Sequence, residues 1–256
     1  MKTIKRIIAW ICQKIFGRVR WLTFLKKVKN INKNSYYNAL SKIVMERTLE
    51  PDSTSIDVGC NKGDILKCMM EYSTNGNFLA FEPLPDFYDG LVKDFPFENV
   101  RIYNLALSDS KGTSSFNYVI SNPAYSGLIK RPYDRPHEED CQIKVNTDTL
   151  DNILESSPVN KVDLIKIDVE GGELLVLKGA INCLKENKPI IIFEHGPGST
   201  QAYDFTSDDL FVLLSGECGL RISTMQDWLL GKPPLTQAEF KDHVYNRINY
   251  YFMAHK

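Results

Sequence analysis

Two short polar segments of the 256-residue sequence have the composition of a nucleoside-binding site. The first is the turn at residues 57–63, in which Gly59 and Gly63 permit a tight bend and a close approach of the backbone to a ligand. The second is Glu82, whose carboxylate can accept hydrogen bonds from both hydroxyls of a ribose. The turn lacks the middle glycine of a dinucleotide-binding loop, which favours a nucleoside without a pyrophosphate over NAD. Taken alone, a structural turn and a solvated glutamate remain the alternatives.

A second group of ionisable residues follows two later apolar segments, and it consists of Lys166, Asp168, Glu170, Glu194 and His195. Carboxylates and an imidazole placed together can take the proton of a hydroxyl group. We predict that His195 or Glu194 is the general base and that Asp168 positions a reactant. A structural ion pair between Lys166 and Asp168 and a role for Glu170 at a helix N-terminus remain open alternatives. A divalent metal on Asp168, Glu194 and His195 is compatible with these ligands, but we predict none.

Short apolar segments that alternate with amphipathic ones predict a doubly wound α/β domain with a mainly parallel sheet. In such a sheet ligands bind beyond the carboxyl ends of the strands, which is where both polar groups occur. Strands are predicted at residues 54–58, 78–81, 100–107, 163–167, 190–193, 220–224 and 250–254, and helices at 36–49, 64–72, 87–93, 173–186 and 206–214.

Two insertions interrupt this alternation. A hairpin is predicted between residues 105–109 and 115–119, with its turn at 111–112. The irregular segment 121–140 follows, and we expect it to cover the site. It carries predicted substrate-binding residues, with aromatic rings for stacking on a sugar and cations for an acidic sugar or phosphate: Tyr125, Arg131, Tyr133 and Arg135, together with Lys130. A solvated loop is the alternative. The second insertion is residues 226–249.

Several sequence blocks occur in an order that points to one family. Ile-Asp-Val-Gly-Cys-Asn-Lys-Gly stands at 56–63, Phe-Glu-Pro-Leu-Pro-Asp at 81–86 and Lys-Ile-Asp-Val-Glu-Gly at 166–171. With further blocks at 104–109 and 145–151, the chain resembles the FkbM family of S-adenosylmethionine-dependent O-methyltransferases. The resemblance implies a class I methyltransferase fold with a seven-stranded sheet, and methylation of a hydroxyl on a saccharide or related metabolite. The alternative is a non-catalytic module of this fold that binds a partner or glycan.

The resemblance also implies which residues hold the cofactor, S-adenosylmethionine. Its amino-acid end would lie on the turn formed by Asp57, Gly59, Cys60, Asn61 and Gly63. Glu82 would hold the ribose, and the adenine would be bordered by Ala106, Leu107, Ser108 and Asp109. The family usually has alanine at the position of Cys60.

Charge is distributed unevenly, although the formal net charge is only −1. Residues 1–34 contain ten Lys or Arg and no Asp or Glu, and residues 3–28 have helical periodicity. We therefore predict a basic amphipathic extension at 1–50 and the methyltransferase domain at 51–256. The extension would either lie on an anionic membrane surface or dock on the acidic domain.

The remaining composition bounds the partners and the compartment. The six cysteines form no CxxC pair, which argues against a zinc ribbon. Scattered cysteines indicate reduced thiols in a cytoplasmic protein. The basic extension adds the inner face of the membrane as a peripheral location. A net charge near zero selects no nucleic acid, so we expect a small-molecule or glycan substrate. The sequence predicts no particular oligomeric state.

Overall fold

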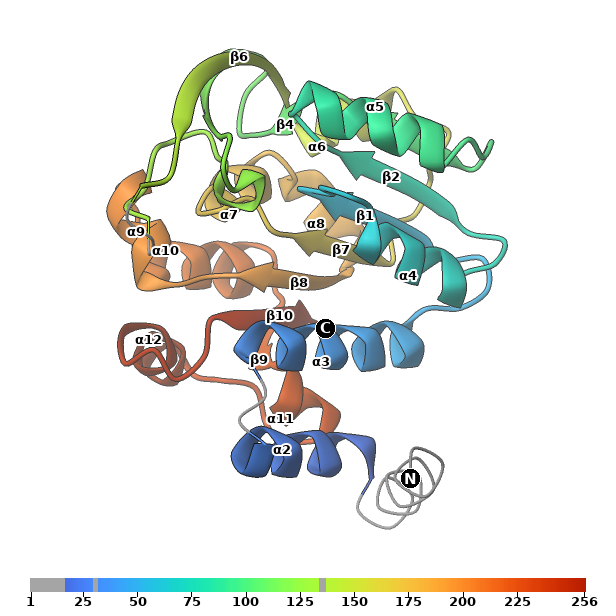
Figure 1. Cartoon of the computed structure of the whole chain (residues 1–256). Coiled ribbons are helices and arrows are strands. Elements are labelled where there is room, and N and C mark those ends of the chain that lie inside the picture. Colours follow the sequence, from blue (N-terminus) through green and yellow to red (C-terminus); the bar gives the residue numbers. More distant parts are fainter. Residues whose placement is uncertain (1–16, 30–31, 134–136) are drawn as a thin grey trace, which may run out of the picture.

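The computed structural model describes residues 17–29, 32–133 and 137–256, and a seven-stranded sheet runs through its centre (Figure 1). The strand order is β3–β2–β1–β7–β8–β10–β9, and neighbours are parallel except for β10, which is antiparallel to β8 and β9. The strands are β1 Thr54–Val58, β2 Asn77–Phe81, β3 Val100–Tyr103, β7 Leu164–Ile167, β8 Ile190–Glu194, β9 Arg221–Thr224 and β10 Tyr251–His255. The predicted doubly wound, mainly parallel, seven-stranded sheet is confirmed.

The direction in which strands are added reverses between β1 and β7. β2 and β3 lie on one side of β1, while β7 and β8 lie on the other. β1 and β7 pair in register, with Asp57 opposite Lys166 and Val58 opposite Ile167. A reversal of this kind opens a crevice at the carboxyl ends of the strands, so the fold directs the ends of β1, β2 and β7 toward one site.

Helices cover both faces of the sheet and bury two hydrophobic cores (Figure 1). One core contains Tyr36 and Met253, and the other contains Leu177 and Phe252. Phe252 and Met253 are neighbours on β10, so the alternation of side chains along a strand separates the two cores. The first face is covered by α3 Lys33–Thr48, α4 Asp64–Tyr72, α5 Pro85–Asp94 and α11 Met225–Leu229. The second is covered by α6 Leu150–Glu155, α7 Glu173–Lys178, α8 Ile181–Asn187, α10 Ser207–Phe211 and α12 Gln237–Tyr245.

The helix predicted at 173–186 is two helices, α7 and α8, with a break at Gly179. A Cβ atom at Gly179 would overlap the backbone oxygen of Ser108, so the chain packs here at a distance that only glycine permits. The helix predicted at 206–214 begins as expected, because Thr206 and Asp209 form the capping box of α10. It continues as the π-helix Val212–Glu217.

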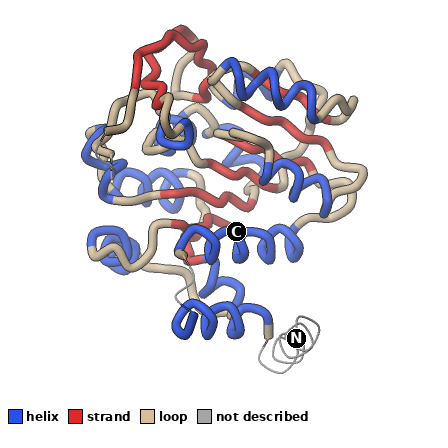
Figure 2. Tube along the Cα trace, in the orientation of Figure 1, coloured by secondary structure: helices blue, strands red, loops and turns tan. Residues whose placement is uncertain are grey.

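The predicted hairpin at residues 105–119 is wrong, and a separate three-stranded sheet takes its place (Figure 2). The strand predicted at 100–107 divides into β3 and the short β4 Ala106–Leu107. β5 Gly112–Val119 pairs antiparallel with β6 Asp140–Asp148, and β6 also pairs parallel with β4. The ion pair between Lys111 and Asp148 joins the predicted turn to β6, a distant partner that a local pattern cannot identify.

The N-terminal part of the described chain packs on the domain. In α2, Arg18–Lys29, Val19 is buried and Arg18 forms an ion pair with Glu46 of α3. α3 belongs to the core of the sheet through Tyr36, Leu40 and neighbouring residues. Residues 1–16, which carry much of the predicted amphipathic pattern, lie outside the described residues, so the membrane contact and the boundary at residue 50 stay predictions. Of the helices described, none has the length and apolar character needed to cross a bilayer.

Candidate functional site

A cavity of about 370 Å³, the first cavity, lies at the carboxyl ends of β1, β2 and β7. This volume lies in the range of small-molecule sites. β1 contributes Asp57, the turn after it contributes Gly59, Cys60 and Asn61, and Glu82 follows the end of β2. These predicted cofactor residues therefore surround one space.

Glu82 connects two of the loops around this cavity. Its carboxylate accepts hydrogen bonds from the backbone N–H of Asn61 (2.8 Å) and of Leu84 (3.0 Å). Burial raises the pKa of Glu82 to about 7, although both N–H groups act to lower it. A carboxylate has about four acceptor positions, so two remain after these bonds are made. Two free acceptor positions suit the vicinal hydroxyls of a ribose.

Asp57 leaves an unsatisfied acceptor in the first cavity. Its side chain is 2% exposed, and Oδ2 has no hydrogen-bond partner among the described residues. Burial, opposed mainly by Lys166, raises the pKa of Asp57 to about 6. A buried polar atom without a partner is costly, so this oxygen fits a ligand that brings a hydrogen-bond donor or a positive charge.

Gly59 brings the turn after β1 close to the end of β7. It has a φ of 77°, and a Cβ atom here would overlap the backbone oxygen of Asp168. Gly63 has a different role from the one predicted, because it does not line the cavity and instead packs against Phe95 and Leu91 at the start of α4.

Only the first half of the predicted adenine border lines the first cavity, and its role toward adenine stays a prediction. Ala106 and Leu107 line the first cavity, whereas Ser108 and Asp109 do not. The backbone N–H of Ser108 donates to Asp148 of β6, and its oxygen faces Gly179. The chain therefore leaves the cavity after β4 and continues into the small sheet.

A second cavity of about 680 Å³ adjoins the first. It lies between the start of α3, the connection from β5 to β6, the end of β8 and the start of β10. Asn38, Ala124, Asp168 and Glu170 line both cavities, so a group bound in one meets a group bound in the other beside these residues.

At the junction, which is the place where the two cavities meet, the predicted ion pair of Lys166 and Asp168 is present. Tyr251 contacts this pair as a third member. Lys166 Nζ lies 2.9 Å from Asp168 Oδ2, and the hydroxyl of Tyr251 donates to the same oxygen at 2.5 Å. Burial acts to raise the pKa of Asp168, but Lys166 and the hydrogen bond from Tyr251 outweigh it and hold the pKa below its ordinary value. Asp168 is therefore an oriented, ionised carboxylate.

Glu194 and Glu170 complete the acidic side of the junction. Burial, and then the charge of Asp168, raises the pKa of Glu194 well above its ordinary value. Glu170 forms an ion pair with Arg131. Oxygens of Asp168, Glu170 and Glu194 lie within 4.8 Å of one another.

His195 does not reach the site, which argues against its predicted role as the general base. Its side chain is fully buried, lines neither cavity, and places Nε2 2.9 Å from the hydroxyl of Ser207. The ring stacks on Phe205 and Phe240 in the core of the opposite face, where burial lowers its pKa to about 4. Residues 194 and 195 leave β8 in opposite directions, so only Glu194 faces the cavity.

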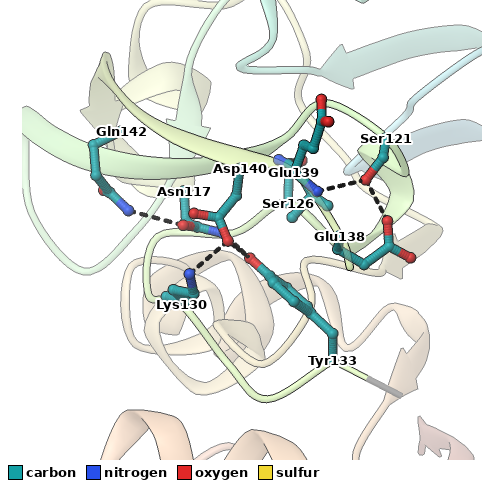
Figure 3. Close-up of polar contacts among 10 residues, drawn as sticks. Asn117, Ser121, Ser126, Lys130, Tyr133, Glu138, Glu139, Asp140 and Gln142 are labelled. Atoms are coloured by element: carbon teal, nitrogen blue, oxygen red, sulfur yellow. Dashed lines mark hydrogen bonds and ion pairs between the residues drawn. The ribbon is translucent and has the colours of Figure 1, made fainter. Parts of the chain in front are cut away.

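Residues 123–133 of the β5–β6 connection contribute side chains to both cavities. The described part of this connection is held by polar contacts (Figure 3). The hydroxyl of Tyr133 accepts from Asn117 Nδ2 (2.6 Å) and donates to Asp140 (2.7 Å), which also pairs with Lys130 (2.6 Å). Tyr125 stacks on Tyr133, with ring centroids 6.4 Å apart.

Tyr125, Arg131 and Tyr133 line the second cavity, as predicted for substrate-binding residues. Arg131, however, pairs with Glu170, so its charge is already compensated within the protein. Arg135 lies outside the described residues.

Residues that sequence patterns did not identify also line the second cavity, from α3, the segment before β10 and the first residue of β10: Lys33, Asn34, Asn38, Arg247, Asn249, Tyr250 and Tyr251. The two segments are bound together, since Tyr37 donates to Asn249 (2.7 Å) and Lys33 to the backbone of Arg247 (3.4 Å). The antiparallel direction of β10 explains Tyr251: its first residue lies opposite Glu194, at the carboxyl edge of the parallel strands.

The chain is similar in sequence to known methyltransferases. Residues 57–222 match the family model described as methyltransferase FkbM domain. The chain is 32% identical over 146 residues to the hexuronic acid methyltransferase AglP of Haloferax volcanii, covering 57% of each protein. It is 26% identical over 150 residues to the 2-O-methyltransferase NoeI of Sinorhizobium fredii, covering 54% of this chain and 62% of that protein. The match thus spans less than two thirds of either relative.

A solved FkbM methyltransferase from Methylobacillus flagellatus has a TM-score of 0.49 at 14% identity, covering 81% of this chain and 44% of that one. The family match confirms the predicted membership of the FkbM methyltransferase family. Since the model covers more than half of the sequence, the chain belongs to the methyltransferase FkbM family.

Proposed function

We propose that this methyltransferase transfers the methyl group of S-adenosylmethionine to a hydroxyl of a saccharide. The observation that carries the proposal is the meeting of two cavities beside Asp168 and Glu194. One cavity has the polar groups that suit a nucleoside, and the other has aromatic and cationic groups that suit a sugar. Because alignment of donor and acceptor provides much of the rate of a methyl transfer, adjoining cavities are the arrangement that this reaction needs.

The first cavity fits the donor residue by residue. Glu82 would hold the ribose hydroxyls, and the unpartnered Oδ2 of Asp57 would take the donor's ammonium group. Ala106 and Leu107 would border the adenine. When bound, the donor supplies a methyl group already activated by the positive charge on its sulfur.

At the acceptor, the chain must remove a hydroxyl proton. Glu194 is the carboxylate that faces the second cavity, and burial together with the charge of Asp168 raises its pKa, which makes it a stronger base than an exposed glutamate. Lys166 and Tyr251 fix Asp168 beside it. We assign Glu194 as the general base and Asp168 as its positioning residue.

The charges around the second cavity favour an acidic saccharide. Within the described part of the chain, Lys33 and Arg247 have no acidic partner, although both line this cavity. The rings of Tyr125 and Tyr250 offer faces on which a sugar can stack. That one relative is named for hexuronic acid and another as a 2-O-methyltransferase agrees with such an acceptor.

A transfer assay with isotopically labelled S-adenosylmethionine tests this function. Acceptors are an oligosaccharide that contains glucuronic acid and its glucose counterpart. The expected product is a labelled methyl ether on the glucuronic acid oligosaccharide. A chain that binds the donor and labels neither sugar would instead support the non-catalytic binding module.

The double variant Lys33→Gln, Arg247→Gln should raise the KM for the glucuronic acid acceptor by about twofold to thirtyfold, because each partly exposed ion pair contributes about 0.2–1 kcal/mol. The kcat and the affinity for the donor should stay unchanged. Lys42→Gln, on an exposed part of α3 that lines neither cavity, is the matched control. Equal effects on acidic and neutral acceptors would contradict the charge preference.

A further inference from the structure

The carboxylate of Glu194 differs from its two neighbours at the junction of the cavities. Asp168 is held by Lys166, and Glu170 by Arg131. Glu194 forms no ion pair with any described residue, although its oxygen lies within 4.8 Å of oxygens from the other two carboxylates. Three carboxylates therefore share two cations.

The groups that face Glu194 are mostly acidic or neutral. Burial has the largest effect on it, followed by the charges of Asp168 and Glu173 and a side-chain hydrogen bond with Asp168, and together they raise its pKa; Arg131 opposes them. Hydroxyls of Tyr37, Tyr250 and Tyr251 also face it, and the cations Lys33 and Arg247 line the same cavity without forming an ion pair with it. Of the three clustered carboxylates, Glu194 is therefore the one whose surroundings favour the protonated form.

Among the described residues no cation pairs with Glu194, so the three carboxylates carry more negative charge than their two paired cations compensate. Asp168 and Glu170 line the first cavity as well as the second, and Asp57 adds an unpartnered oxygen, 98% buried, to the first. If the proposed function is correct, the sulfonium of the methyl donor enters the first cavity and delivers its methyl group at the junction. A cation placed near a protonated carboxyl favours loss of its proton.

We propose that Glu194 releases its proton when the positively charged donor binds, and takes up the acceptor's hydroxyl proton when that charge disappears. This inference rests on the proposed function and adds to it a link between donor charge and the state of the base. The base is thereby ionised only when a donor is present to react.

The step balances in atoms and charge. The bond between the methyl carbon and sulfur breaks, and its electron pair stays on sulfur, which becomes neutral. The methyl carbon bonds to the hydroxyl oxygen, and the hydroxyl proton passes to the carboxylate of Glu194. Glu194 ends the cycle protonated, as it began, and the loss of the sulfonium charge makes it a stronger base while the proton moves.

Calorimetric titration of the full chain tests the proposal without turnover. S-adenosylmethionine and its neutral product, S-adenosylhomocysteine, are titrated at pH 7 in phosphate and in Tris, whose ionisation enthalpies differ. The difference between buffers gives the protons released. We expect the cationic ligand to release up to about one more proton per site than the neutral one. Protons from Asp57 and Glu82 appear with both ligands and cancel.

Two variants and a pH series decide the source of the proton. Glu194→Gln should abolish the difference between the ligands, whereas Glu98→Gln, at an exposed position, should retain it. In the unaltered chain, the preference for the cationic ligand should increase with pH by up to about tenfold per unit while Glu194 is protonated. This second measurement does not depend on the folding of a variant.

The outcomes separate the two proposals. Equal proton release by the two ligands, or a difference that persists in Glu194→Gln, would overturn the link between donor charge and Glu194 while leaving the methyl-transfer function intact. Failure of the chain to bind either ligand would instead refute the proposed function.

Discussion

Replacing Glu82 with alanine should raise the dissociation constant for S-adenosylmethionine by about 10²- to 10⁴-fold. In the proposed complex the variant would lose two hydrogen bonds that the carboxylate accepts from the ribose hydroxyls, each of which contributes about 1.5–3 kcal/mol. It also frees the backbone N–H groups of Asn61 and Leu84, which Glu82 now holds. Calorimetry or equilibrium dialysis measures the change directly.

The exposed Glu98→Ala variant is the control for this substitution, and its affinity should match that of the unaltered chain. Circular dichroism establishes that both variants fold. If the folded Glu82→Ala variant binds the donor with unchanged affinity, the ribose lies elsewhere and the assignment of the first cavity is wrong.

Replacing Glu194 with glutamine should lower kcat by about 10²- to 10⁴-fold, the range that a positioned general base contributes. The amide keeps the size of the side chain but cannot accept a proton at working pH. Because Glu194 lines the second cavity and not the first, the affinity for S-adenosylhomocysteine should change little. Single-turnover kinetics measures the chemical step apart from product release.

A Glu194→Asp variant provides the comparison, since it retains a carboxylate at a greater distance and should recover part of the rate. If Glu194→Gln turns over as fast as the unaltered chain, another group takes the proton. Asp168, already ionised beside Lys166, would then be the candidate to test.

That the residues of the first cavity lie together was predictable from sequence, because this cavity is built locally. Gly59, Asn61 and Glu82 directly follow β1 and β2, and parallel strands place their carboxyl ends side by side. The position of this cavity therefore follows from β1, the turn after it and Glu82, and little knowledge of long-range contacts is needed. The exceptions, Ser108 and Asp109, come after the chain has left the central sheet for the smaller one.

The acceptor side was not predictable, for three physical reasons. His195 and Glu194 are adjacent in sequence, but the pleat of β8 directs them to opposite faces. Tyr251 reaches the site because β10 runs antiparallel, a direction that its apolar pattern does not reveal. The small sheet depends on β6, whose partner strand β5 lies across a long irregular connection.

Part of the second cavity is formed by residues outside the matched family domain, and this bears on how acceptor specificity differs among homologous proteins. The family model covers residues 57–222, whereas the wall of the second cavity includes Lys33, Asn34 and Tyr250, which lie outside those bounds and do not line the first cavity. If the proposed acceptor binds in the second cavity, substitutions at these three positions should change which acceptor is methylated and leave the affinity for S-adenosylmethionine unchanged. Exchanging these three residues between homologues would show whether acceptor selectivity moves with them.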